Sequence, residues 1–118
     1  MTIEEIVFNY LKTKLEDISL YLDEPGELPD EYISMKRIAS GLTDHIGAAT
    51  LEFQCYAPSK YEAAALDEEL KNTLLGYGSG YGITETPEVS ACKFGGSNDA
   101  TDPGTKKYRY RSYYNFFY

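Results

Sequence analysis

The sequence predicts an α+β fold in which two helices pack on one face of an antiparallel or mixed sheet, in the order α-β-β-β-α-β-β. Two segments repeat apolar residues at the spacing of an amphipathic helix, and five others have the alternation or the composition of strands. Helices interleaved with hairpin-sized strands are typical of this fold class. At 118 residues, the chain is expected to form one domain over residues 1–118.

The first helix is predicted over about residues 3–16. Thr2 and Glu5 form a capping-box pattern at its start, and Glu4 and Glu5 suit the positive end of the helix dipole. Its apolar residues share one helical face: Ile3, Ile6, Val7, Tyr10, Leu11 and Leu15.

Three strands are predicted between the helices. Residues 18–22 alternate as a short strand, residues 23–30 have the composition of an acidic loop, and residues 32–39 form a second strand. A polar turn is predicted over residues 41–48, and the third strand spans residues 50–57. The third strand has two distinct faces, one with Leu51, Phe53 and Cys55 and the other with Glu52, Gln54 and Tyr56.

The second helix is predicted to begin after Pro58 and to end at Gly76. Ser59 and Glu62 form a second capping box. Residues 76–82 contain four glycines and are predicted to form a mobile loop. The residues expected on the apolar face of this helix are Tyr61, Ala65, Leu66, Leu70 and Leu74. Those expected on its solvated face are Asp67, Glu68 and Glu69.

The last two strands are predicted at residues 88–94 and 106–118, separated by a polar turn over residues 95–104. Thirteen extended residues span about 43 Å, so the last strand is expected to bend or to project beyond its partner. One of its faces carries Tyr108, Tyr110, Ser112, Tyr114, Phe116 and Tyr118. The other carries Lys107, Arg109, Arg111, Tyr113, Asn115 and Phe117.

The net charge of −8 argues against a sequence-specific nucleic-acid binder, which needs a basic surface. The charge is uneven, because acids dominate residues 1–35 whereas residues 104–118 carry four cations and no acid. Such a chain can meet copies of itself with complementary potentials, although the charge alone favours two separately solvated faces. The 12 tyrosines suit half-buried positions, either in the sheet or at interfaces.

We expect no enzymatic activity, no cofactor and no metal. His45 is the only histidine, Cys55 and Cys92 lie 37 positions apart, and the glycine run fits no phosphate-binding motif. Both thiols are expected to be buried in a reducing cytoplasm. No signal peptide is expected, and no apolar run approaches the length of about 20 residues that crosses a membrane.

Three segments in order carry a resemblance to a known family. An Ile/Glu-rich helix leads into Leu20-Tyr21-Leu22-Asp23-Glu24. A strand ending Phe53-Gln54-Cys55-Tyr56-Ala57 runs at once into Ser59-Lys60-Tyr61-Glu62-Ala63-Ala64, and the last strand opens Lys107-Tyr108-Arg109-Tyr110. Over nearly the whole chain, this pattern resembles the tail terminator (tail completion) proteins of long-tailed bacteriophages.

The resemblance implies a structural virion protein that assembles in the host cytoplasm. Members of that family form a ring, usually a hexamer, at the head-proximal end of the tail, where it ends tube growth and provides the head-docking surface. The implied partners are copies of the chain itself, the tail-tube protein and the head–tail connector protein. DNA is expected to pass through the lumen without specific binding, and no membrane is involved.

The expected contact surfaces are the last strand, with an open edge that extends a neighbour's sheet, and the loops at residues 23–31, 41–48 and 76–87. The residues expected in contacts are Tyr108, Arg109, Tyr110, Arg111, Tyr113, Tyr114, Phe116, Phe117, Glu24, Glu27, Asp30, Asp44, His45, Tyr77 and Tyr81. The alternatives are another head–tail joining protein, such as a head-closure or connector subunit, and a small monomeric binding module of the host. An enzyme that relies on acids and tyrosines alone is the third alternative.

Overall fold

In the computed structural model, which describes residues 2–22, 28–43, 46–77, 82–101 and 108–118, five strands form one mixed sheet. The elements in chain order are α1 (Ile3–Lys14), β1 (Ser19–Tyr21), β2 (Tyr32–Thr43), β3 (Ile46–Ala57), α2 (Lys60–Leu75), the 3₁₀ helix η1 (Gly82–Glu85), β4 (Ala91–Asp99) and β5 (Tyr108–Phe117).

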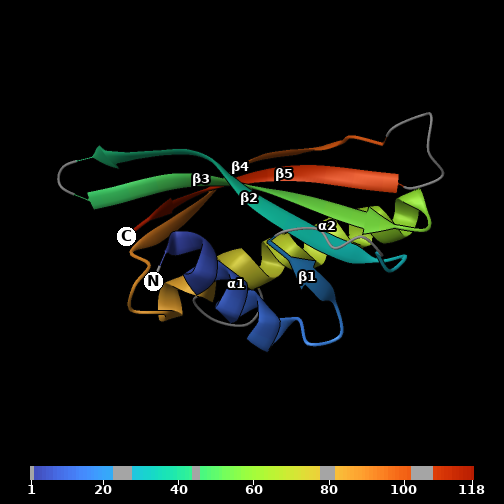
Figure 1. Cartoon of the computed structure of the whole chain (residues 1–118), viewed down its shortest axis with the longest axis horizontal. Coiled ribbons are helices and arrows are strands. Elements are labelled where there is room, and N and C mark those ends of the chain that lie inside the picture. The colour runs from blue at the N-terminus through green and yellow to red at the C-terminus, as the bar shows by residue number, and fades with distance from the viewer. Residues whose placement is uncertain (1, 23–27, 44–45, 78–81, 102–107) are drawn as a thin grey trace.

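The strand order in the sheet is β1-β2-β3-β5-β4, with β1 parallel to β2 and the other neighbours antiparallel. Figure 1 shows both α-helices on the same side of the sheet. The predicted α+β class is therefore confirmed, and the observed element order differs from the predicted one only by η1.

Both α-helices begin at the predicted N-caps. The Thr2 side chain accepts a hydrogen bond from the Glu5 N–H at 3.3 Å, and Ser59 Oγ accepts one from the Glu62 N–H at 3.2 Å. These bonds satisfy backbone donors that have no partner inside the helix. Gly76 ends α2 in the left-handed conformation with φ 75°, as glycine does at many helix C-termini.

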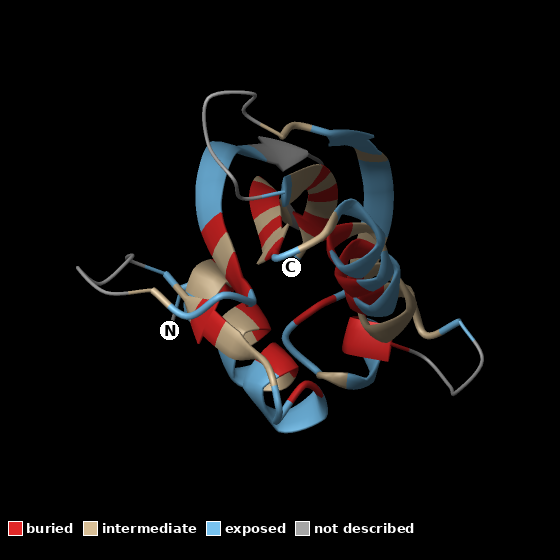
Figure 2. Ribbon diagram, turned by 90° about the vertical axis from the view of Figure 1, so that its right-hand side faces the viewer, coloured by how far each residue is buried: buried red, intermediate tan, exposed pale blue. Residues whose placement is uncertain are grey.

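The core lies between the helices and the inner face of the sheet, where Figure 2 shows buried segments in red. Val7 and Leu11 of α1 and Leu70 of α2 are fully buried there, against Phe53 and Tyr114 of the sheet. The helical periodicity of the sequence therefore predicted most of the buried helix positions correctly.

Three expectations about α2 are wrong. Tyr61 and Ala65, expected on the apolar face, are exposed, Tyr61 to 83%, and Asp67, expected in solvent, is only 6% exposed. Asp67 follows the buried Ala63 by one turn and precedes the buried Leu70 by one turn, so it shares their side of the helix.

The hairpin of β2 and β3 is longer than predicted. Residues 41–43 and 46–48, expected in a polar turn, continue the two strands, and residues 44–45 lie outside the described residues. The end of the chain supports this part of the hairpin, because the backbone N–H and C=O of Gly47 pair with those of Tyr118 at 2.7 and 2.8 Å. A bulge between Arg37 and Ala39 shifts the register of β2, so these two residues lie on opposite faces of the sheet.

Two further segments differ from the prediction. The polar turn expected at residues 95–104 belongs to β4 as far as Asp99, because a bulge at Gly96, with φ 135°, keeps the strand paired with β5. The loop expected at residues 76–87 contains η1, in which Gly82 and Ile83 are buried against the end of α2. Glycine at position 82 therefore serves close packing.

The expected open edge on the last strand is also wrong. β5 lies inside the sheet, between β3 and β4, and its backbone pairs on both sides. The edges of the sheet are β1 and β4.

Candidate functional site

The face of the sheet opposite the helices is the candidate site, and we call it the outer face. Residues directly opposite each other in paired strands share a face, so the register fixes its membership. Among the described residues, no helix lies on this face (Figure 1). The outer face consists of Tyr32, Ser34, Lys36, Ala39 and Gly41 of β2, Ala48, Thr50, Glu52, Gln54 and Tyr56 of β3, Arg109, Arg111, Tyr113, Asn115 and Phe117 of β5, and Ala91, Lys93, Gly96 and Asn98 of β4.

Polar side chains of β3 and β5 form a continuous network on the outer face. Arg111 Nε lies 3.4 Å from Glu52 Oε1, which also accepts a hydrogen bond from Gln54 Nε2 at 2.6 Å. Gln54 Oε1 in turn accepts bonds from the Tyr56 hydroxyl at 2.7 Å and from Arg109 at 3.3 Å. The two arginines are therefore held in place before any partner arrives, which lowers the entropy lost on binding.

Aromatic rings continue this network toward the β1 edge. The Arg109 guanidinium lies 5.8 Å from the centre of the Tyr56 ring, which stacks on Tyr32 at 4.5 Å. Tyr32 meets Tyr21 edge to face at 5.9 Å. Tyrosine and arginine are among the residue types that contribute most to protein interfaces.

The outer face is cationic although the chain carries a net charge of −8. It presents Lys36, Lys93, Arg109 and Arg111, and its one carboxylate among the described residues is Glu52. Glu52 is only 7% exposed, so the positive groups are what a partner meets. This distribution favours an acidic partner.

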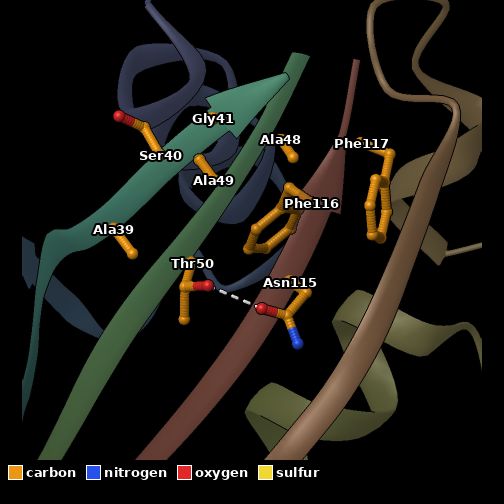
Figure 3. Close-up of a pocket in the computed structure, with 9 residues that line it drawn as sticks. All are labelled: Ala39, Ser40, Gly41, Ala48, Ala49, Thr50, Asn115, Phe116 and Phe117. Atoms are coloured by element: carbon orange, nitrogen blue, oxygen red, sulfur yellow. Dashed lines mark hydrogen bonds between the residues drawn. The ribbon is translucent and has the colours of Figure 1, made fainter. Parts of the chain in front are cut away.

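A hollow of about 110 Å³ lies on the outer face where the β2–β3 hairpin meets the end of β5. Small side chains leave this space, and the Thr50 hydroxyl bonds to Asn115 Oδ1 at 2.6 Å beside it (Figure 3). The residues around it are Ala39, Ser40, Gly41, Ala48, Ala49, Thr50, Asn115, Phe116 and Phe117.

The structure divides the contact residues expected on β5 into two groups. Arg109, Arg111, Tyr113 and Phe117 lie on the outer face, whereas Tyr108 and Tyr110 lie on the helix side near the β3–α2 connection. The expectation was wrong for the other two, Tyr114 and Phe116. Both are fully buried in the core, so neither side chain is available to a partner in this fold.

The contact residues expected in loops are scattered. Asp30 is exposed before β2, and Tyr77 is 61% exposed after α2. Those outside the described residues are Glu24, Glu27, Asp44, His45 and Tyr81.

Sequence reasoning missed half of the outer face. Glu52, Gln54 and Tyr56 alternate on one side of their strand, and this signal was visible in the sequence. It remained unused because alternation does not reveal which strands are neighbours. Only the pairing of β3 with β5 brings these residues to Arg109 and Arg111.

A second cleft, of about 400 Å³, lies between α1 and η1. Its polar groups mostly bind one another. Lys14 Nζ lies 3.2 Å from Glu85 Oε1, and the Tyr10 hydroxyl donates to the Thr73 carbonyl at 3.4 Å. Burial, and next the Glu85 carboxylate, raises the pKa of Tyr10 to about 12, so this phenol stays protonated at neutral pH. These contacts give the cleft a structural role.

A third group of polar atoms is enclosed between α2 and β5. Asp67 Oδ1, Ser112 Oγ and the Tyr114 hydroxyl are buried without a hydrogen bond of ordinary geometry. Burial raises the pKa of Asp67, although the nearby hydroxyls of Ser112 and Ser97 partly oppose the shift. Within the described residues, no three His, Cys, Asp or Glu side chains are grouped as metal ligands.

The sequence matches no known protein-family profile and no curated protein. Among the helices described here, none has the length and apolar character needed to cross a membrane.

Proposed function

We propose that this chain is a structural subunit of a long-tailed bacteriophage, a tail terminator whose ring ends growth of the tail tube and offers the docking surface for the head. The observation that supports the proposal most is the outer face. It is broad, uncovered by the described helices, and rich in arginine and tyrosine held by fixed hydrogen bonds. The order of sequence features that resembles the tail terminator family adds to this support.

The chemistry of the outer face suits assembly better than catalysis. Its hydrogen bonds and its ion pair immobilise Arg109, Arg111 and Gln54, and the hollow at Thr50 and Asn115 is small and lined largely by Ala, Gly and Phe. A surface of this kind binds another macromolecule through shape and charge. The proposed partners are copies of the chain, the tail-tube protein and the connector protein, with DNA passing through the ring unbound.

The test is assembly of tail tubes in the presence of the chain. The tube protein of the same virus is polymerised alone and with the chain, and the products are imaged by negative-stain electron microscopy. Rings, or shorter tubes capped at one end, are the expected result. Tubes of unchanged length without caps would contradict the proposal, and binding to the connector protein instead would identify a head-closure role.

Two variants test whether the outer face is responsible. Lys36 and Lys93 are exposed on this face, so changing both to glutamate reverses charge there and disturbs no core contact. We expect the double variant to cap fewer tubes. Changing Lys12, which is exposed on α1, to glutamate is the control for each single change, Lys36→Glu or Lys93→Glu, and it is expected to cap normally.

A further inference from the structure

The exposed side of α2 carries a surface that neither the core nor the outer face uses. We call it the α2 ridge, and it consists of Tyr61, Glu62, Ala65, Glu68, Glu69 and Asn72. Tyr61 projects from it with 83% of its surface exposed. A large aromatic side chain exposed to this degree on a helix is well suited to a partner contact.

The α2 ridge is acidic and weakly compensated. Glu62, Glu68 and Glu69 lie on it, and within the described part of the chain the ion pair of Glu68 is a long one, with Lys71 Nζ at 4.0 Å from Glu68 Oε2. Lys60, at the start of the helix, is paired with Asp99 instead, at 3.3 Å. The ridge therefore presents a negative surface to a partner.

The α2 ridge also contains a shallow depression of about 360 Å³. Ala65 lies in it beside Glu68, Glu69 and Asn72, and Thr73 and Tyr77 complete the lining. Side chains as long as arginine fit into such a depression while their charged ends reach the carboxylates.

The α2 ridge and the outer face are complementary in charge and in shape. One presents three carboxylates and a projecting ring, and the other presents four cations and a hollow. Outer faces of two copies do not suit each other, because cations would meet cations.

The spacing of the contact residues along α2 also matches the spacing along β5. Tyr61 and Glu68 are seven residues apart, about 10 Å along a helix. Asn115, beside the hollow, and Arg111 are four residues apart, about 13 Å along a strand. The difference is within the reach of the arginine and glutamate side chains.

We propose that the α2 ridge of one copy docks on the outer face of the next, with Tyr61 in the hollow at Thr50 and Asn115 and with Glu68 facing Arg111. This inference rests on the proposed ring and names its subunit contact. The two surfaces are different, so the contact is head to tail. Repetition of such a contact gives a ring when the rotation closes.

Self-association is the first measurement. Tyr61→Ala and Glu68→Lys alter exposed side chains and leave the core intact, so both variants are expected to fold. Each is expected to weaken self-association about tenfold or more in sedimentation equilibrium. Glu16→Lys makes the same charge change at an exposed site beyond α1 and is expected to associate like the wild type. The proposal would be overturned if the wild type and all three variants associated equally.

A cysteine cross-link tests the geometry directly. In a Cys92→Ser background, copies with Tyr61→Cys are mixed with copies carrying Thr50→Cys and oxidised, both free and on capped tubes. We expect a disulfide between the two kinds of copy. A Glu16→Cys copy mixed with the Thr50→Cys copy is the control and is expected to give none. The docking would be overturned if the Tyr61→Cys copies gave no more disulfide-linked product than this control, both free and on capped tubes.

The outcomes separate the two proposals. Wild-type protein that caps tubes without the Tyr61–Thr50 cross-link would reject the docking and leave the terminator function standing. Cross-linked copies that never cap a tube would support the docking and reject the terminator function. Wild-type protein that stays monomeric, free and with tubes, but binds single-stranded DNA at the outer face would reject the docking in favour of a nucleic-acid partner.

Discussion

Replacing Gly82 by alanine is expected to destabilise the fold strongly. Gly82 begins η1 with φ 64°, a left-handed conformation that side chains with a Cβ adopt rarely. A Cβ at this position would lie 2.6 Å from the Gly76 nitrogen and 2.7 Å from the Leu75 carbonyl carbon, and closer still to the Leu74 carbonyl oxygen. All three are backbone atoms at the end of α2, so no rotamer change relieves the clash.

Two effects contribute to the loss of unfolding free energy in Gly82→Ala. A left-handed residue with a Cβ costs roughly 1–2 kcal/mol, and overpacking in a buried site costs roughly 1–3 kcal/mol. Their sum is about 2–5 kcal/mol. In a domain of this size, each kcal/mol lowers the melting temperature by about 4 °C, so a fall of about 8–20 °C is expected.

Thermal unfolding followed by circular dichroism measures this effect, and two other glycines serve as matched controls. Gly96→Ala introduces only a backbone cost, because Gly96 has φ 135° but no atom within 4 Å of the added Cβ. Gly41→Ala introduces neither cost, and it is expected to leave the melting temperature unchanged or slightly higher. The expected order of melting temperature, highest first, is Gly41→Ala, Gly96→Ala, Gly82→Ala. A Gly82→Ala variant that melts within about 2 °C of the wild type would refute the reasoning.

Three other perturbations have defined outcomes. Burial raises the folded-state pKa of Asp67, so the contribution of this residue to stability is greatest below the ordinary carboxyl pKa of about 4 and falls as the pH rises toward the folded-state value. Asp67→Asn is therefore expected to gain stability relative to the wild type as the pH rises from 4 to 7, measured by urea unfolding. A difference in unfolding free energy between the two proteins that stays constant over this pH range would contradict this account. Ser59→Ala removes the N-cap of α2 and is expected to cost about 1 kcal/mol in the same assay, whereas a loss below about 0.3 kcal/mol would show that the cap contributes little. Burial raises the pKa of Cys55 well above the usual thiol range and that of Cys92 to about 12. Both thiols are therefore expected to react with Ellman's reagent only on unfolding. Rapid reaction of the native protein would contradict the burial of Cys55.

The helices were predictable because their signals are local. Thr2 and Ser59 mark the N-caps, and the apolar spacing identifies the buried stripe on each helix. The exceptions at Asp67 and Tyr61 come from tertiary packing. The approach of β5 to α2 encloses Asp67, and Ala63 fills the buried position at the start of α2, which leaves Tyr61 in solvent.

The strand ends and the strand order were not predictable in the same way. Residues 46–49 and 95–99 are rich in Gly, Ala, Ser and Asn, which have low intrinsic β propensity, and they are extended because a neighbouring strand pairs with them. The alternation in the last strand correctly separated its two faces. It did not reveal that β5 lies between β3 and β4, and this placement changes Tyr114 and Phe116 from contact residues into core residues.

Because β5 lies inside the sheet, deleting the end of this strand does not test assembly by itself. A deletion of residues 113–118 removes Tyr114 and Phe116 from the core, so a loss of assembly after that deletion would report unfolding. Exposed residues such as Tyr61 and Glu68 test assembly without this ambiguity.

The position of β5 also has a consequence for synthesis of the chain. β4 leaves the ribosome before β5, yet β5 is its only neighbour in the sheet that the structure describes. β3 ends at Ala57 and acquires its second neighbour only when β5 begins at Tyr108. Until then the backbone edges of β3 and β4 lack their native partner, and pairings so distant in sequence form slowly. The nascent chain is therefore most exposed to misassociation just before β5 emerges, and conditions that slow translation there are expected to increase aggregation.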